Sequence, residues 1–343
     1  MQTTTKLVGV IFYAFCFFLL TSCINEKNYK SDILKPNADK EYGELLFALD
    51  KKYWNSKLGK NIEKEFEKLV KTTPLPFEKE FNIDFIVPEK VMKNIKRKNC
   101  LLFIEISAHN SKNSEPIIER DLWAKGQLVI ELKFQSEKEA ISYFETNANE
   151  LKLLINEFYY TLISRQYTVK NTVNSTLNDA LSLNFKTPKE IKLNSKGDDF
   201  WWFSELSIKK DQNGPHEIQK GLVIYKYPYY DKNQLTKEYQ IKKRDSIGEK
   251  HLKGKLNNSY MKTIVNDIYE TSASSYLINK EYVFRLSGCW KMVNDKMGGT
   301  FVSISRISKD KKHIITTEGY VYAPNFKKLK LLREQEALIN SSF

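Results

Sequence analysis

The stretch Ser136–Leu162, SEKEAISYFETNANELKLLINEFYYTL, carries the clearest secondary-structure pattern in the sequence. Its apolar residues recur at steps of three and four, which places them on one face of an α-helix. They are Ile141, Phe144, Ala148, Leu151, Ile155, Phe158 and Leu162. Ser136 with Glu139 three positions later is the pattern of a capping box at a helix N-terminus. The stretch therefore predicts a long amphipathic helix whose apolar face packs on a core.

The chain ahead of this helix alternates predicted strands with predicted helices. Strands are expected over Glu44–Leu49, Phe81–Val87, Cys100–Ile106 and Leu128–Phe134. Apolar residues at every fourth position from Trp54 to Val70 predict a helix that Pro74 and Pro76 end. Pro88 opens a second, short helix. The first half is therefore predicted to be an α+β sandwich.

The second half is predicted to be richer in strands. Gly221–Tyr230 alternates its apolar and aromatic side chains between two faces. Further strands are expected over Tyr282–Val293, Thr300–Ile307 and His313–Tyr322, with a turn at Asn294–Gly299 and helices over Thr236–Leu252 and after Asn325. The predicted fold class is α+β, with two α/β-sandwich-like subdomains of mostly antiparallel sheet and amphipathic helices, the second half more β-rich.

The segment Ser164–Asn178 is polar and has little apolar periodicity, so we place a domain boundary near Lys170. Four parts are expected. Residues 1–22 form a signal peptide, and residues 23–42 form a flexible tether rich in Asn, Lys and Ser. Residues 43–170 form an N-terminal α+β subdomain, and residues 171–343 form a C-terminal α+β subdomain with a β-meander and a terminal helix.

The N-terminus predicts export and lipid anchoring. The apolar run Leu7–Leu20 is shorter than the roughly 20 residues of a membrane-spanning helix and fits the core of a signal peptide. It ends in Leu20-Thr21-Ser22-Cys23, which resembles the bacterial lipobox. The alternative is an ordinary secretory signal in which the cysteine is incidental. We expect cleavage before Cys23 and acyl chains on its thiol, which make a lasting membrane anchor.

The composition narrows the expected location and partners. The chain has 55 basic and 42 acidic side chains, a formal net charge of +13, with its lysines spread along the sequence. A basic excess can serve an anionic lipid, glycan or nucleic acid, but the even spread and the export signal argue against nucleic acid. Only one acid, Glu26, follows Cys23 closely, so no acidic surface-export cluster is present. We expect an outer-membrane lipoprotein facing the periplasm, with an envelope protein or cell-wall glycan as partner.

The thiols and imidazoles give no motif for a cofactor or a metal. Cys100 and Cys289 lie in apolar, strand-like runs, where they can either pair as a disulfide or remain buried free thiols. The four histidines lie far apart in the sequence and have no helical partner acid. A His-rich metal site and a Ser-His-Asp triad therefore lack sequence support, and we expect neither a metal nor a cofactor.

Several short motifs together resemble a known family. They are Leu49–Trp54, Trp123–Lys125, Gln127–Ile130, Asp198–Trp201, Tyr227–Tyr229, Lys243–Ser246, Ser259–Met261, Trp290–Lys291, Met297–Gly299 and Glu318–Pro324. The chain resembles, from about Gly43 to Ile339, the uncharacterised Bacteroidota lipoproteins described as domain of unknown function 4837. Gly126 and Thr300 stand where proline is expected, which affects loops. The resemblance implies the lipobox and a two-part α+β chain, and it implies no activity.

Three carboxylates are the catalytic candidates. Asp198 and Asp199 precede an aromatic strand, and Asp245 lies in Lys-Arg-Asp-Ser. A glycosidase needs two carboxylates that face each other roughly 5 to 9.5 Å apart. The alternative is structural, because neighbouring aspartates commonly cap turns and an aspartate beside an arginine commonly pairs with it.

The binding candidates are mainly aromatic: Trp123, Lys125, Gln127, Trp201, Tyr227 and Trp290. Such side chains can form a platform for sugar rings or peptides, although cross-strand aromatic ladders also close sheet cores. Trp201 and Trp202 must point to opposite faces of their strand, so at most one of them serves a given platform. The leading hypothesis is a non-catalytic envelope binding or assembly module. The competing hypothesis is a glycan or peptide hydrolase that uses the second-half carboxylates.

Overall fold

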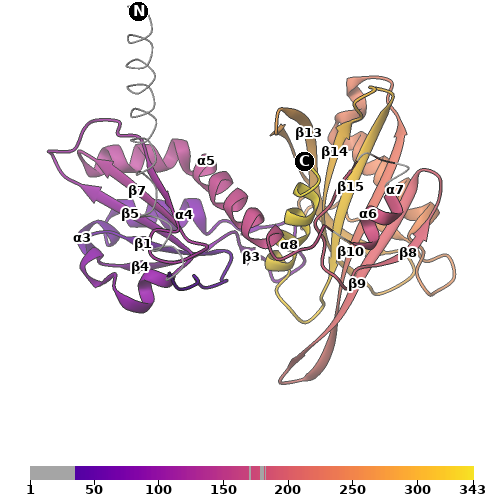
Figure 1. Cartoon of the computed structure of the whole chain (residues 1–343), viewed down its shortest axis with the longest axis horizontal. Helices are drawn as coiled ribbons and strands as arrows, with labels where there is room; N and C mark the ends of the chain where they lie inside the picture. The colour runs from indigo at the N-terminus through magenta and orange to yellow at the C-terminus, as the bar shows by residue number, and fades with distance from the viewer. Residues whose placement is uncertain (1–34, 170, 178–180, 182) are drawn as a thin grey trace, which may run out of the picture.

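A computed structural model describes residues 35–169, 171–177, 181 and 183–343. Each half of the chain has its own sheet and its own flanking helices, and helix α5 (Glu137–Ser164) runs from the first sheet to the second domain (Figure 1). The mixed α+β class predicted from the sequence is confirmed. Cys23, the signal peptide and the predicted boundary at Lys170 lie outside the described residues.

The first domain is built on a five-stranded sheet in the order β4-β1-β5-β7-β6. Its strands are β1 (Glu44–Ala48), β4 (Asn82–Ile86), β5 (Cys100–Ile106), β6 (Ile117–Arg120) and β7 (Leu128–Phe134). The four strands from β4 to β7 pair in parallel, and only β6 is antiparallel. The expectation of mostly antiparallel pairing is therefore wrong for this half. The chain between β1 and β4 contains helices, as a parallel crossover usually does, whereas the chain between β5 and β7 contains β6 and no helix.

The helix predicted from Trp54 to Val70 is shorter and is divided in two. Helices α3 (Lys51–Trp54) and α4 (Lys57–Phe66) each begin at a side-chain cap, on Asp50 and Ser56 respectively. The chain then turns into β2 (Leu69–Val70), which pairs with β3 (Glu78–Lys79). The Ser56 hydroxyl accepts a hydrogen bond from the Leu58 amide and so starts a new helix. This new start separates α4 from α3. The short helix predicted after Pro88 is present as two 3-10 turns, η1 (Pro88–Lys90) and η2 (Lys93–Arg97).

Helix α5 forms where the sequence predicted it. The Ser136 hydroxyl accepts a hydrogen bond from the Glu139 amide, but the Glu139 carboxylate binds the amides of Gln135 and Asn113, so the capping box is not closed. Its apolar face packs with α4 on the first sheet through Phe144, Ala148, Ile155 and Phe158 among others. Although α5 is long, no helix of the described chain is both long and apolar enough to cross a membrane.

The second domain is built on one antiparallel sheet in the order β11-β13-β14-β15-β10-β9-β8, with β12 also paired to β13. The strands are β8 (Lys192–Lys196), β9 (Phe200–Asp211), β10 (Gly214–Pro228), β11 (Met261–Thr263), β12 (Ser272–Ile278), β13 (Glu281–Met292), β14 (Gly298–Ile307) and β15 (His313–Tyr322). The helices are α6 (Thr172–Leu177), η3 (Lys232–Leu235), α7 (Lys237–His251) and α8 (Leu329–Asn340). The predicted meander, α7 and the terminal helix are confirmed.

The two faces of this sheet carry different cores. Leu222 and Ile224 of β10 pack toward α6 and α8, whereas Val223, Tyr225 and Tyr227 pack toward α7. This is the alternation that the sequence predicted, and it also places Trp201 and Trp202 on opposite faces.

The glycines predicted to form a turn at Asn294–Gly299 belong instead to a strand. Gly298 and Gly299 open β14, and residues 293–297 make the turn. A Cβ on Gly299 would lie 1.9 Å from the Val321 carbonyl oxygen. Close approach of neighbouring backbone is therefore the reason for glycine at this position.

Residues 35–42 lie against the first domain, so the predicted tether to residue 42 is too long. Asn37 bridges to Lys125, and the Ala38 amide donates to the Lys125 carbonyl. The Asp39 amide donates to the carbonyl of Arg97. These backbone bonds extend the domain's packed structure back to about residue 35.

An arm from the first domain, residues 69–79 including β2 and β3, reaches across to the second. The Thr300 hydroxyl donates to the Thr72 carbonyl at 2.7 Å, and the Glu270 amide donates to the Lys71 carbonyl at 3.0 Å. The Glu78 carboxylate accepts hydrogen bonds from the amides of Lys328 and Leu329. A carboxylate of one domain thus caps the N-terminus of α8 in the other, where it also complements the helix dipole.

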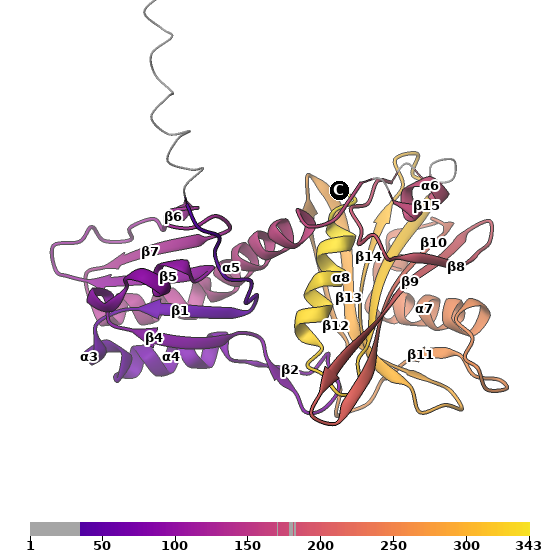
Figure 2. The ribbon, with the colours of Figure 1, turned by 60° about the horizontal axis from the view of Figure 1, so that its bottom comes forward.

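A second contact between the domains joins α5 and α8. Arg333 of α8 donates to the Asn156 side chain on α5 at 3.4 Å and also to the Glu80 carbonyl. Its guanidinium lies 5.0 Å from the Phe81 ring and packs against Gly43, whose φ of +101° favours glycine. The arm and this helix pair fix how the domains sit relative to each other (Figure 2).

Replacing Glu78 by alanine is expected to reduce the free energy of unfolding by about 1 kcal/mol, because α8 loses its cap. Urea denaturation followed by circular dichroism measures the change. Glu89→Ala is the matched control, since Glu89 is exposed and the change should stay within about 0.5 kcal/mol. Equal losses for the two variants would contradict the capping role.

Candidate functional site

The aromatic candidates of the second half lie in the core. Trp201, Tyr227 and Trp290 are all buried, and Trp201 is on the opposite sheet face from the other two. Tyr227 stacks between Tyr225 and Tyr239 with ring centroids 6.1 and 6.3 Å away. They form two separate parts of the sheet core, so they do not make one exposed platform.

The candidates of the first half, Trp123, Lys125 and Gln127, belong to one loop that hydrogen bonds hold in place. The side-chain amide of Gln127 is buried and donates to the carbonyls of Lys96 and Lys98, both at 2.8 Å, while its oxygen accepts from the Trp123 amide. The Trp123 ring packs edge-on against Phe103, with Lys96 above it. Lys125 is exposed, and its backbone joins residues 36–38. These contacts give the three residues a structural role in the loop.

The three aspartates are held in different places. Asp198 and Asp199 are exposed where β8 leads into β9, and Asp199 pairs with Lys226 at 3.3 Å. Asp245 on α7 accepts two hydrogen bonds from Thr263 of β11, at 2.8 and 2.7 Å. Four strands separate β11 from β9 in the sheet order. Sequence reasoning expected Asp245 to pair with its neighbour Arg244. The two do form an ion pair, at 4.0 Å, but the guanidinium binds Glu318 more closely, through two hydrogen bonds of 2.8 Å.

The cysteines and metal-ligating side chains that the structure describes form no reactive cluster. Cys100 and Cys289 are buried free thiols, one in each domain, which resolves the alternatives left open by the sequence. Burial raises the pKa of both thiols to about 12, which keeps them protonated and unreactive. Across the described part of the chain, no group of three or more His, Cys, Asp or Glu side chains could hold a metal ion.

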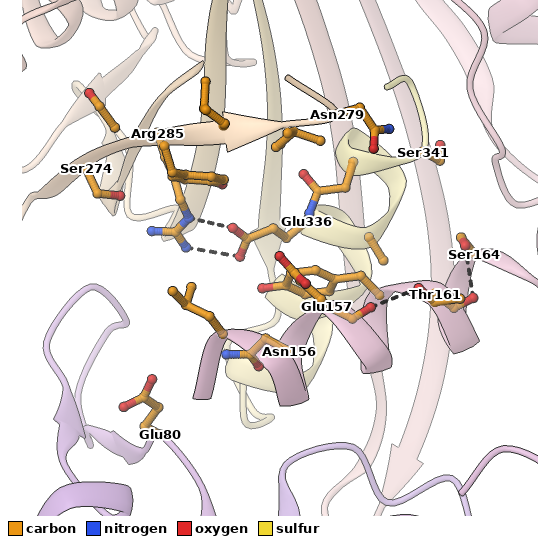
Figure 3. Close-up of a pocket in the computed structure, with 18 residues that line it drawn as sticks. Glu80, Asn156, Glu157, Thr161, Ser164, Ser274, Asn279, Arg285, Glu336 and Ser341 are labelled. Atoms are coloured by element: carbon orange, nitrogen blue, oxygen red, sulfur yellow. Dashed lines mark hydrogen bonds and ion pairs between the residues drawn. The ribbon is translucent and has the colours of Figure 1, made fainter. Parts of the chain in front are cut away.

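A cleft of about 790 Å³ lies between the domains, within the size range of ligand sites. One wall is α5 and the other is β12, and α8 lies between and behind them, as Figure 3 shows. We call it the interdomain cleft. Its lining residues are Glu80, Leu153, Asn156, Glu157, Tyr160, Thr161, Ser164, Ser274, Ser275, Tyr276, Leu277, Ile278, Asn279, Arg285, Glu336, Ala337, Asn340 and Ser341.

The walls are mixed in chemistry. The lining residues of α5 recur at steps of three and four from Leu153 to Ser164, so they share one helix face. Most carry hydroxyl, amide or carboxylate groups. Leu153 and Leu277, on opposite walls, are apolar and remain 59% and 66% exposed. The cleft therefore offers both polar partners and apolar contact area.

An ion pair crosses the cleft between β13 and α8. Arg285 and Glu336 meet through two hydrogen bonds, Nε to Oε1 at 2.5 Å and Nη2 to Oε2 at 3.0 Å (Figure 3). Burial alone would raise the pKa of Glu336, but Arg285 lowers it below its ordinary value. Removal from water also raises the pKa of the Tyr160 phenol, an effect that nearby Glu336 adds to. At neutral pH the pair is ionised, and Tyr160 is a neutral hydrogen-bonding group.

The cleft has an acidic excess in a basic protein. Its lining includes three glutamates and one arginine. Glu336 is paired with Arg285, and Glu80 is paired with Lys152 at 2.9 Å. Glu157 has no ion pair with any described residue, and its side chain is exposed to the cleft. An incoming cation would therefore find an unpaired carboxylate.

Sequence reasoning missed this site because its signals were weak. Strand β12 was not predicted, since Ser-Ala-Ser-Ser-Tyr-Leu-Ile has no clear alternation. Leu153 lies away from the apolar stripe of α5, and an exposed leucine off that stripe was the available clue. The convergence of residues 80, 153–164, 274–285 and 336–341 depends on how the domains are joined.

The fold and the cleft define a class: a two-domain α+β protein with a cleft between its two halves. Residues 170–341 match the family described as Domain of unknown function (DUF4837), and the chain belongs to that family. Residues 39–168 match a second family, Domain of unknown function (DUF8532). The first-half motifs that suggested the resemblance thus fall in the region of the second match. None of the curated proteins matches the chain.

Replacing Glu336 by glutamine is expected to cost about 3 kcal/mol of unfolding free energy at neutral pH, because Arg285 loses its charged partner. That figure is the low end for a buried pair, since Arg285 is 23% exposed. Because folding lowers the pKa of Glu336, its contribution is complete above 4.5 and is lost as the pH falls below that value.

Urea denaturation at neutral pH and below pH 4.5 measures this difference. The gap between wild type and Glu336→Gln should narrow in acid, whereas Glu157→Gln should change the unfolding free energy by less than about 0.5 kcal/mol. If the difference in unfolding free energy between wild type and Glu336→Gln stays constant with pH, the ion pair is not the cause of that difference.

Proposed function

We propose that this protein is a non-catalytic binding module of the cell envelope, anchored by lipid on Cys23, that takes its ligand in the interdomain cleft. The observation that carries the proposal is the cleft itself, whose walls come from both domains. The arm and the α5–α8 contact hold those walls in place. A preformed site of this kind loses little conformational freedom when a ligand enters it.

The arrangement of charges supports binding over hydrolysis. A glycosidase general acid requires a carboxyl group whose pKa is raised near the substrate. In the cleft, Arg285 lowers the pKa of Glu336. The carboxyl group whose pKa burial does raise is Glu318, which is enclosed under α7 with Arg244. The hydrolase alternative therefore has no specific observation in its favour.

The proposed anchor places this cleft near a membrane. Between Cys23 and the packed chain at residue 35 lie residues 24–34, which even fully extended span at most about 40 Å. We infer that residue 35 lies within this distance of the outer membrane and that the module works on its periplasmic face. An envelope protein or a cell-wall component would be within reach there.

Replacing Cys23 by alanine is expected to move the protein from the membrane fraction to the soluble fraction, because the thiol that carries the lipid is gone. Metabolic labelling with a radioactive fatty acid should show incorporation in the wild type and none in the variant. Cys16→Ala is the matched control, since Cys16 lies inside the apolar run and should leave labelling intact. Labelled Cys23→Ala protein would overturn the anchor.

A photo-crosslinking amino acid placed at Leu153 tests the cleft in living cells. We expect a defined crosslinked product, because Leu153 lines the cleft and is exposed to whatever fills it. The same amino acid at Glu150, one turn away on α5 and outside the cleft, should give no such product. Equal products from both positions, or none from Leu153, would count against a ligand in the cleft.

A further inference from the structure

Strand β12 presents a bare edge. Within the described parts of the chain it pairs with β13 alone, so one row of its backbone N–H and C=O groups has no strand partner. Its sequence, Ser-Ala-Ser-Ser-Tyr-Leu-Ile, contains no charged residue and no proline. Natural proteins normally protect an edge strand with such residues, because an unprotected edge recruits other chains.

The opposite edge of the same sheet is protected. Strand β8 begins with Lys192 and ends with Lys196, and its pairing with β9 is shifted between Leu193 and Ser195. Lysines and a local irregularity are two usual means of preventing edge pairing. The difference between β8 and β12 indicates that the β12 edge is left open for a partner.

The interdomain cleft runs along this edge. Six consecutive residues, Ser274–Asn279, line it. Side chains of a strand alternate between faces, so a cleft that touches every residue in turn follows the strand's edge. Helix α5 lies across from it (Figure 3). A single extended chain can enter between them, whereas α5 stands where a second copy's sheet would have to lie.

We propose that the cleft binds an extended, basic polypeptide segment, which adds to β12 as a further strand. This inference rests on the proposed function and names the ligand class of the same site. Backbone hydrogen bonds to β12 would give affinity, as in other cases of strand addition. The free carboxylate of Glu157 selects a lysine or arginine, and Leu153 and Leu277 contact the apolar side chains that alternate with it.

The cleft's chemistry favours this occupant over a glycan. A neutral glycan lacks the regular row of amide donors and carbonyl acceptors of a peptide, and it carries no cation for Glu157. With Glu80 and Glu336 in ion pairs, the Glu157 carboxylate remains in the cleft as a complement to a cationic side chain. Peptide and glycan binding are thus separable by experiment.

The test uses fluorescent eight-residue peptides and the purified two-domain protein, measured by fluorescence polarisation. The probe alternates lysine and valine. The first control has the same side chains but N-methyl groups on alternate amides, which removes the donors needed for strand addition. We expect saturable binding of the probe and a loss of roughly tenfold or more with the N-methylated peptide. A glutamate-valine peptide should not bind.

Two charge-reversal variants test the placement. Glu157→Lys should weaken probe binding roughly threefold to tenfold, and added salt should reduce that difference. Glu150→Lys, two helical turns before Glu157 on α5 and outside the cleft, should leave binding unchanged. Equal effects of the two variants, or equal binding of the N-methylated peptide, would overturn strand addition beside Glu157.

The peptide-binding and crosslinking results together distinguish a failure of this inference from a failure of the proposed function. If the peptides fail but the Leu153 crosslink still forms in cells, the cleft binds a ligand of another class, such as a glycan. If both fail, the binding module itself is wrong.

Discussion

The cap that Glu78 places on α8 is the contact on which the rest of the structure depends. Glu78 lies in β3 of an arm from the first domain, and other residues of the arm bond to β14 and to the chain before β12. A helix N-terminus needs acceptors for its free amides, and here they come from another domain. Folding of α8 and docking of the domains are therefore linked, and the cleft beside them has a defined shape.

The cleft is a consequence of this joint. Helix α5 packs on the core of the first domain as far as Leu162, and the other face of its last turns contacts α8 through Asn156. The polar face of those turns then stands opposite the bare edge of β12. Neither wall is a site alone. Together they leave a half-open cleft that holds the Glu157 carboxylate beside unpaired backbone, an arrangement that suits an extended basic chain better than a flat ligand.

Prediction from sequence succeeded where residues act through local patterns. Helix α5, strands β5 and β7, and the alternation of Leu222 through Tyr227 were all evident, because burial on one face imposes a period on the sequence. Prediction failed where the type of residue alone suggested an exposed side chain or a chemical role. Trp201 and Trp290 fill cores and Gln127 supports a loop, because large aromatic and amide side chains serve packing and backbone satisfaction as readily as binding.

The sequence by itself determined the lipobox prediction at Cys23, the α+β class, most strand positions and membership of the family matched over residues 170–341. Each of these depends on residues close together in the chain. The tertiary structure decided the parallel pairing of the first sheet, the partner of Arg244, the free state of Cys100 and Cys289, and the cleft. These depend on contacts between residues far apart in sequence, which a local pattern does not encode.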